Sequence, residues 1–440
     1  MRLFLLSMFV ASGLVVADVA EAQQSRPERP YRGLFAGGVG DTEQLLTARA
    51  SLGAGWDDNL VADAIGRSDG RSALASDVNQ GFRGGLGTGS ADLSYTLNRA
   101  SVGVGAAAGT TTRYYPGLAR RFIRRDYANL GTSAVLGAGF SAQAGVSYQP
   151  YSLRSLTPWL TEPQLTDPTV VDEDFPASLE HYVGYSAGVG FTRRLTRRTT
   201  FSSTYDYGGR ERLGEIGRFD RHTAGASLSR ELGRDFSLQL GYRYSEARYA
   251  AGDRRVNHLM DVGVNYNRAL SFSRRTTLSF STGTSASRTA RTDALQYRAT
   301  GSARLNHEIG RTWNAMVAYD RGLRFVETWP EPLFTDSASA GVSGSLNRRT
   351  QVQFVARGVR GDRHLGSLGA GDRIESFVAT AGLTVAATRH INTGLTYTYY
   401  THQFGSGVSL PPGFARDFDR RSVRAFVSLW APLFQRARRP

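Results

Sequence analysis

Apolar and polar residues alternate one by one along much of this chain. The clearest example is residues 236–244, where one row of side chains consists of Phe236, Leu238, Leu240, Tyr242 and Tyr244. A period of two is typical of a strand with one apolar and one polar face. Aromatic rings at both ends of the row, with aliphatic residues between them, suit a strand that crosses a bilayer. About ten tilted residues are enough to cross.

The same alternation recurs in pairs of segments that are joined by a short turn, and longer connections separate the pairs. Eight such hairpins, together with end strands at Leu46–Trp56 and Val423–Leu433, give about eighteen strands. The sequence therefore predicts an all-β fold, a transmembrane antiparallel up-and-down β-barrel. The longer connections are expected outside the cell, among them Ser287–Gln296 and Val326–Asp336. A soluble all-β repeat or solenoid is the alternative.

Aromatic residues occupy the two ends of the predicted strands. Tyrosines mark the ends next to the longer connections: Tyr148, Tyr205, Tyr207, Tyr242, Tyr244, Tyr319, Tyr397 and Tyr399. Phenylalanines and a tryptophan mark the ends next to the short turns: Phe140, Phe191, Phe201, Phe236 and Trp313. Two aromatic belts in one register favour the membrane barrel over the soluble alternative.

The ends of the chain carry targeting features. Residues 1–22 are typical of a secretory signal peptide, with Arg2, an apolar run and a small-residue cleavage site at Ala20 to Ala22. Residues 23–44 are read as a short periplasmic segment, 45–434 as the barrel and 435–440 as a tail. No later apolar run is long enough for a membrane helix, and the chain has no cysteine. We expect the bacterial outer membrane.

Positive charge is a strong feature of the composition. The 53 basic residues are all arginines, and the formal net charge is +15. Such a balance in a cytosolic protein indicates nucleic acid, which export argues against. Two explanations remain: biased codon usage with charged turns, or a basic lumen that favours anions.

Charged residues on the polar face of the predicted strands must point inward, because an ionised group is costly against lipid. The expected pore-lining set is Arg49, Arg243, Arg298, Arg304, Arg357, Arg424, Asp206, Asp261 and Asp320, with Asp92 beside it. These residues either line a water-filled pore or form a charge network that braces the barrel.

The connection Pro150–His181 is long and acidic. Asp172, Glu173 and Asp174 are candidates for a loop that folds inward and constricts the pore, as in diffusion porins. The same cluster facing outward would hold divalent cations beside lipopolysaccharide phosphates. A solvated loop is the third possibility.

Motifs for chemistry are absent or explained by the strands. Gly184–Gly188 matches the G-x-S-x-G pattern, but that motif needs a strand, a sharp turn and a helix, and here it lies inside an alternating strand. The seven histidines never fall within four residues of one another. We expect no enzyme activity, no cofactor and no metal site.

The tyrosine-rich strands, the arginine-rich turns such as Arg193–Arg198 and the segment Gly55–Asn59 after the first strand resemble the outer-membrane porins grouped as β-barrel porin 2. The resemblance implies an association with exopolysaccharide export. One departure concerns the barrel-assembly machinery, which normally reads a terminal aromatic residue. Here Phe434 is followed by six further residues.

The sequence thus predicts a porin-like channel for small or anionic solutes. The expected partners are outer-membrane lipid and lipopolysaccharide, the assembly machinery and the transported solute, with no nucleic acid. The alternatives are an exopolysaccharide export porin and a non-conducting structural or adhesive barrel.

Overall fold

The computed structural model describes residues 42–59, 83–116, 122–152, 176–212, 218–249, 254–270, 273–289, 292–326, 329–362, 373–406 and 416–437. Within these ranges the regular structure consists of eighteen strands. The first nine are β1 (Thr42–Asp57), β2 (Gly84–Asn98), β3 (Val102–Tyr114), β4 (Phe122–Gly137), β5 (Phe140–Ser152), β6 (Pro176–Thr196), β7 (Thr199–Arg212), β8 (Arg218–Glu231) and β9 (Phe236–Arg248). The others are β10 (Arg254–Leu270), β11 (Ser273–Thr289), β12 (Thr292–Ile309), β13 (Trp313–Val326), β14 (Trp329–Asn347), β15 (Thr350–Asp362), β16 (Arg373–Ala386), β17 (Ile391–Phe404) and β18 (Asp417–Ala437).

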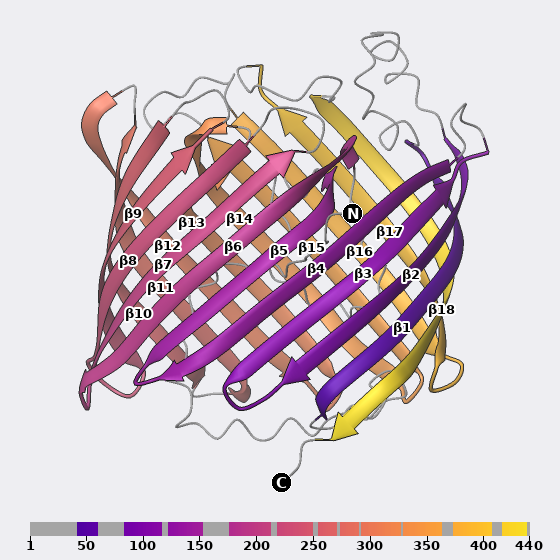
Figure 1. The fold of residues 1–440 in the computed structure, drawn as a ribbon, viewed down its shortest axis with the longest axis horizontal. Helices are drawn as coiled ribbons and strands as arrows, with labels where there is room; N and C mark the ends of the chain where they lie inside the picture. Colours follow the sequence, from indigo (N-terminus) through magenta and orange to yellow (C-terminus); the bar gives the residue numbers. More distant parts are fainter. Residues whose placement is uncertain are drawn as a thin grey trace, which may run out of the picture.

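The strands form one closed antiparallel sheet. Each pairs with its neighbours in the sequence, and β1 also pairs with β18, so that the first and last strands lie side by side (Figure 1). The predicted up-and-down barrel of eighteen strands is confirmed. None of the described residues forms a helix that is long and apolar enough to span a membrane.

The period of two divides the side chains between two faces of the wall. Along β18, Arg420, Ser422 and Arg424 are buried, whereas Val423 and Val427, which alternate with them, are 38% and 52% exposed. We call the face of Arg424 the inner face and the opposite one the outer face. Residues paired directly across strands share a face, so the register extends this division to every strand.

The outer face carries all thirteen residues of the two predicted aromatic belts, as the register of the paired strands shows. Between the belts it exposes aliphatic side chains, among them Leu52, Leu240 and Val317. The inner face is largely polar or small. A small hydrophobic cluster of Leu86, Tyr115 and Ile123 is buried near one end of β2 and β4.

The two edges of the barrel differ. At one edge, the short-turn edge, two to four residues separate consecutive strands, and the ends at Thr42 and Ala437 also lie there. The predicted turn of Gly137, Ala138 and Gly139 is at this edge, and all three residues have positive φ, which glycine tolerates best. The opposite edge, the connection edge, contains the longer connections.

Several strands run further than the sequence pattern predicts. The segments Ser287–Gln296 and Val326–Asp336 are wrong as long loops, because only two residues separate β11 from β12 and β13 from β14. Backbone pairing continues there through residues without apolar alternation, such as Ser287 opposite Gln296. At its ends the wall extends three residues beyond the range 45–434 on either side.

Candidate functional site

The inner face is the surface on which charged residues gather. The register places all nine residues of the expected pore-lining set there: Arg49, Arg243, Arg298, Arg304, Arg357, Arg424, Asp206, Asp261 and Asp320. They come from nine different positions on eight strands, so they are distributed around the wall rather than concentrated in one pocket.

Four consecutive strands, β7 to β10, bring one of the expected arginines together with two of the expected aspartates. Asp206 on β7 interacts electrostatically with Arg221 on β8 and Arg243 on β9, and it accepts a hydrogen bond from Gln143 on β5. Asp261 on β10 interacts with the same Arg243. Two adjacent arginines, on β8 and β9, thus lie between an aspartate on β7 and an aspartate on β10, so each carboxylate has a cationic neighbour, which lowers the cost of placing charge on this part of the wall.

A second charged group lies where β1 meets β2. Arg49 is paired directly with Asp92, and Asp92 with Gly109 on β3. The ring of Tyr127 on β4 lies over Gly109, because a Cβ at position 109 would be 2.7 Å from Tyr127 Cε1 and 2.8 Å from Asp92 Cβ. Glycine therefore makes room for the aromatic ring beside the carboxylate.

The remaining expected residues do not form one cluster. Arg298 on β12 lies with its Cζ 4.9 Å from the ring centre of Phe334, and Arg304, six residues further along the same strand, is exposed. Asp320 on β13 and Arg357 on β15 are half-buried. At about 3.3 Å per residue, Arg298 and Arg304 present charge at two levels of the wall, about 20 Å apart.

The deepest charged group joins the two ends of the sheet. Asp57, the last residue of β1, is fully buried and accepts hydrogen bonds from Arg420 on β18, with Nε 2.8 Å from Oδ2 and Nη2 also in contact. Arg424 Nη2 lies 3.9 Å from the same oxygen. The Arg424 side chain crosses Gly55, where a Cβ would lie 2.8 Å from Arg424 Cγ and 2.3 Å from the Val423 carbonyl oxygen.

The two residues after Asp57 continue this attachment. Asp58 accepts a hydrogen bond from the Arg421 backbone N–H at 2.6 Å, and the Asn59 amide donates to the Asp419 carbonyl at 3.0 Å. The segment Gly55–Asn59, which the sequence singled out for its family resemblance, thus holds the first strand against the last. We call the residues Asp57, Arg420 and Arg424 the closure triad.

His402 is a buried histidine on the inner face of β17. Its Nδ1 lies 2.8 Å from Ser376 Oγ and 3.2 Å from Tyr400 Oη, and its ring centre is 4.0 Å from that of Phe404 in a T-shaped contact. These neighbours are hydroxyl and aromatic groups. Across the described strands and turns, no group of three or more His, Asp or Glu residues is arranged to hold a metal ion.

Sequence reasoning missed Arg221, Asp57 and Arg420, because all three lie outside the predicted strands: Asp57 was assigned to a loop, and the other two lie between a predicted connection and a predicted strand. The missing signal was continuation of the period of two beyond the last apolar residue of each strand: Arg221 is in phase with Thr223, and Arg420 with Ser422 and Arg424. Charged residues at the ends of strands are easily mistaken for loop residues, because loops are also rich in charged residues.

Other sequence predictions have mixed outcomes. Gly184–Gly188 lies within the continuous strand β6, as expected for a chance match to the nucleophile motif. The constriction-loop candidates Asp172, Glu173 and Asp174 lie outside the described residues, as do the signal peptide and the end of the tail.

No protein-family model matches the chain, and no curated protein matches it. Several solved structures resemble it. The FrpB iron transporter from Neisseria meningitidis (F3-3 variant) is 12% identical with a TM-score of 0.44, covering 90% of this chain and 82% of that one. OccAB4 from Acinetobacter baumannii is 9% identical (TM-score 0.42; 92% and 100% covered), and OccK2 from Pseudomonas aeruginosa in complex with glucuronate is 11% identical (0.43; 89% and 99%). Likeness at this level concerns the barrel alone and says nothing of what this chain binds or carries.

Proposed function

We propose that this protein is a porin-like channel of the bacterial outer membrane that passes small or anionic solutes. The observation that carries the proposal is the sorting of side chains across a single closed wall. Leu52, Leu240 and Val317 on the outer face are 73%, 52% and 55% exposed, while the inner face holds the six arginines and three aspartates of the expected set.

An apolar surface that extends around the barrel is unfavourable in water, because monomeric soluble proteins rarely expose patches larger than a few hundred Å². In a bilayer the same surface is matched to the hydrocarbon, and closure of the sheet leaves no edge strand along the wall. The strands are 13 to 21 residues long, more than the roughly ten that a tilted strand needs to cross. A signal peptide at residues 1–22 suits export to that membrane.

The inner face supports aqueous passage and a preference for anions. The expected set contains six arginines and three aspartates, and charges facing a lumen attract ions of the opposite sign. The acidic residues Asp172, Glu173 and Asp174, in the connection between β5 and β6, are proposed to oppose these arginines at a constriction. Membership of the β-barrel porin 2 group belongs to the same proposal.

Planar-bilayer recording of the refolded full chain tests this function. Stepwise conductance in potassium chloride is expected, with a reversal potential across a salt gradient that has the sign of anion selectivity. Folded protein that inserts but gives no conductance would overturn the channel and select a structural or adhesive barrel.

Export of a polyanionic exopolysaccharide is the second candidate function. It is favoured by Arg298 and Arg304, which stand at two levels on the inner face of one strand and suit successive contacts with a charged polymer. Block of the anion current by uronic-acid oligomers would select this function, and free passage of unrelated ions and sugars would select the general channel.

A further inference from the structure

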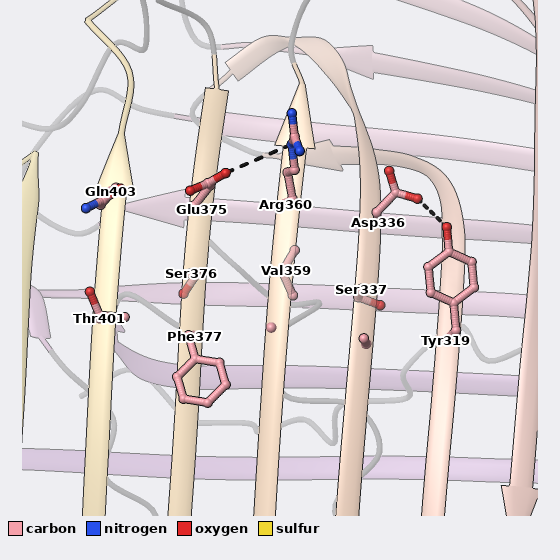
Figure 2. A pocket seen from close by; sticks show the side chains of 12 residues that line it. Tyr319, Asp336, Ser337, Val359, Arg360, Glu375, Ser376, Phe377, Thr401 and Gln403 are labelled. Carbon is pink, nitrogen blue, oxygen red and sulfur yellow. Dashed lines mark hydrogen bonds and ion pairs between the residues drawn. The ribbon is translucent and has the colours of Figure 1, made fainter. Parts of the chain in front are cut away.

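A groove of about 470 Å³ opens on the outer face of the wall, near the connection edge. Five strands, β13 to β17, contribute to it, and Figure 2 shows the lining side chains. Two registered rows of residues build it. The lower row runs across the strands as Tyr319, Ala338, Gly358, Phe377 and Thr401. The groove therefore lies on the side of the barrel opposite to the proposed lumen.

The floor of the groove is formed by residues with little or no side chain. Ala338 and Gly358 are paired directly between the rings of Tyr319 and Phe377, and the next row toward the short-turn edge contains Ala340, Ala356 and Ala379. A Cβ at Gly358 would meet a single heavy atom within 4 Å, Phe377 Cδ2 at 3.7 Å. The space above Gly358 is thus open, and its walls are aromatic and aliphatic.

The upper row is charged and lies at the connection edge of the groove. It runs as Arg321, Asp336, Arg360, Glu375 and Gln403. The Tyr319 hydroxyl donates to Asp336 at 2.5 Å, whereas Arg360 is 4.0 Å from Glu375 and Arg321 is 3.5 Å from Asp336 (Figure 2 shows the first two contacts). Both arginine contacts are longer than a hydrogen bond.

Arg321 also contacts the Tyr319 hydroxyl and the Phe334 ring, but a guanidinium carries five donors, so both arginines keep donors for a ligand. Their side chains are 54% and 43% exposed, for Arg360 and Arg321 respectively, and guanidinium groups bind phosphate in a bidentate manner. The carboxylates of Asp336 and Glu375 stand beside them, and Glu375 also contacts Arg373 Nη2. Divalent cations take oxygen ligands from carboxylates and phosphates alike. The apolar lower row and the charged upper row therefore match the two parts of a lipid molecule, its acyl chain and its phosphorylated headgroup.

We propose that this groove binds one molecule of lipopolysaccharide, with an acyl chain over Ala338 and Gly358 and a phosphate at Arg360 and Arg321. This rests on the proposed function, because the connection edge of an outer-membrane barrel faces the outer leaflet, where phosphorylated glycolipid is the lipid present. A second copy of this chain fits less well, because packing two like faces together would bury the charged row.

The test is binding of fluorescently labelled lipopolysaccharide to the refolded full chain in detergent with magnesium, followed by anisotropy. Gly358→Leu fills the groove, and the double variant R321Q/R360Q removes the phosphate donors. Each is expected to weaken binding about tenfold, as for loss of a charge-assisted contact or of a buried chain segment. Gly89→Leu is the matched control, since a Cβ there meets Leu52 Cδ2 at 3.5 Å on the outer face of β2. Arg193→Gln, on the outer face at the short-turn edge, is the charge control.

Unchanged affinity in Gly358→Leu or in R321Q/R360Q overturns the proposal, and so does competition by phosphatidylglycerol as strong as that by unlabelled lipopolysaccharide. A change of oligomeric state in Gly358→Leu with unaltered lipid binding identifies a second copy as the occupant and also overturns it. Heat-modified gel mobility establishes that each variant is folded. Conductance of the same preparations reports on the channel separately, so loss of one function is distinguishable from loss of the other.

Discussion

Asp57 and Arg420 join the first and last strands of the barrel through a buried ion pair, with the guanidinium Nε 2.8 Å from Asp57 Oδ2. The two residues are 363 positions apart in the sequence. A buried pair of this kind adds little to stability over an apolar pair, but losing one partner leaves a buried charge without compensation. The closure triad is therefore a sensitive point of the wall.

Removing one member of the triad is expected to destabilise the barrel by about 3–5 kcal/mol. Asp57→Asn should cost more than Arg420→Met, because Asp57 contacts two arginines, and Arg424 stays 3.9 Å from it when Arg420 is replaced. Urea unfolding in micelles, monitored by the gel mobility of the folded barrel, measures the difference.

The double variant D57N/R420M supplies the internal control. Its loss should be smaller than the sum of the two single losses, because neither partner then remains as a lone charge beside the other's position. Strict additivity would mean that the pair does not couple the two strands.

Gly109 is expected to reject any side chain. A Cβ at this position would lie 2.7 Å from Tyr127 Cε1, so Gly109→Ala forces the ring to move and should cost about 1–3 kcal/mol. The measurement is the urea midpoint. Gly89→Ala, with its nearest contact at an ordinary 3.5 Å, should leave the midpoint where it is. Equal effects of the two substitutions would contradict the close approach of Tyr127.

A new charge should destabilise the barrel on the outer face of β9 but not on its inner face. Leu240 is 52% exposed on the outer face, and Leu240→Arg is expected to cost about 2–4 kcal/mol if that face meets hydrocarbon. Gln239 is on the inner face of the same strand, and Gln239→Arg should be nearly neutral. The two variants are compared by their folding yield and their free energy of unfolding in lipid vesicles. A similar cost for both would show that lipid and water are not separated by this wall.

The inner-face arginines should set ion selectivity. Replacing Arg243, Arg298, Arg304 and Arg357 by serine removes four positive charges from the inner face and should shift the reversal potential in a salt gradient toward that of an unselective pore. The matched control replaces four outer-face arginines by serine: Arg193, Arg230, Arg248 and Arg254. Selectivity that is unchanged in the first variant, or altered equally in both, would refute the basic lumen.

The fold was predictable because the alternation of apolar and polar residues within each strand identifies its two faces. On β9, Leu238 and Leu240 lie on one side and Gln239 and Arg243 on the other, so the alternation defines the register locally. Eighteen such strands favour a closed wall, because closure removes the unpaired edges of the sheet. The strand ends were less predictable, because backbone pairing continues where apolar alternation stops. β11 reaches Thr289 through serines, threonines and an arginine that read as loop.

The candidate site was predictable one residue at a time and not as an arrangement. Alternation alone assigned Arg243 and Asp206 to the inner face, but their shared neighbour Arg221 lay outside the predicted strands. Contacts between distant segments, such as Asn59 with Asp419, leave no trace in either local pattern. The outer groove was likewise hidden, since it depends on which rows of β13 to β17 fall beside one another.

The pairing of β1 with β18 has a consequence for biosynthesis. The outward backbone donors and acceptors of β1 stay unpaired until β18 has been synthesised and has reached it. Every shorter translation product therefore has two unpaired edge strands. A nonsense mutation anywhere upstream of Asp417 should therefore yield no partly functional protein. Its product is a fragment with unpaired edge strands, which periplasmic proteases would degrade.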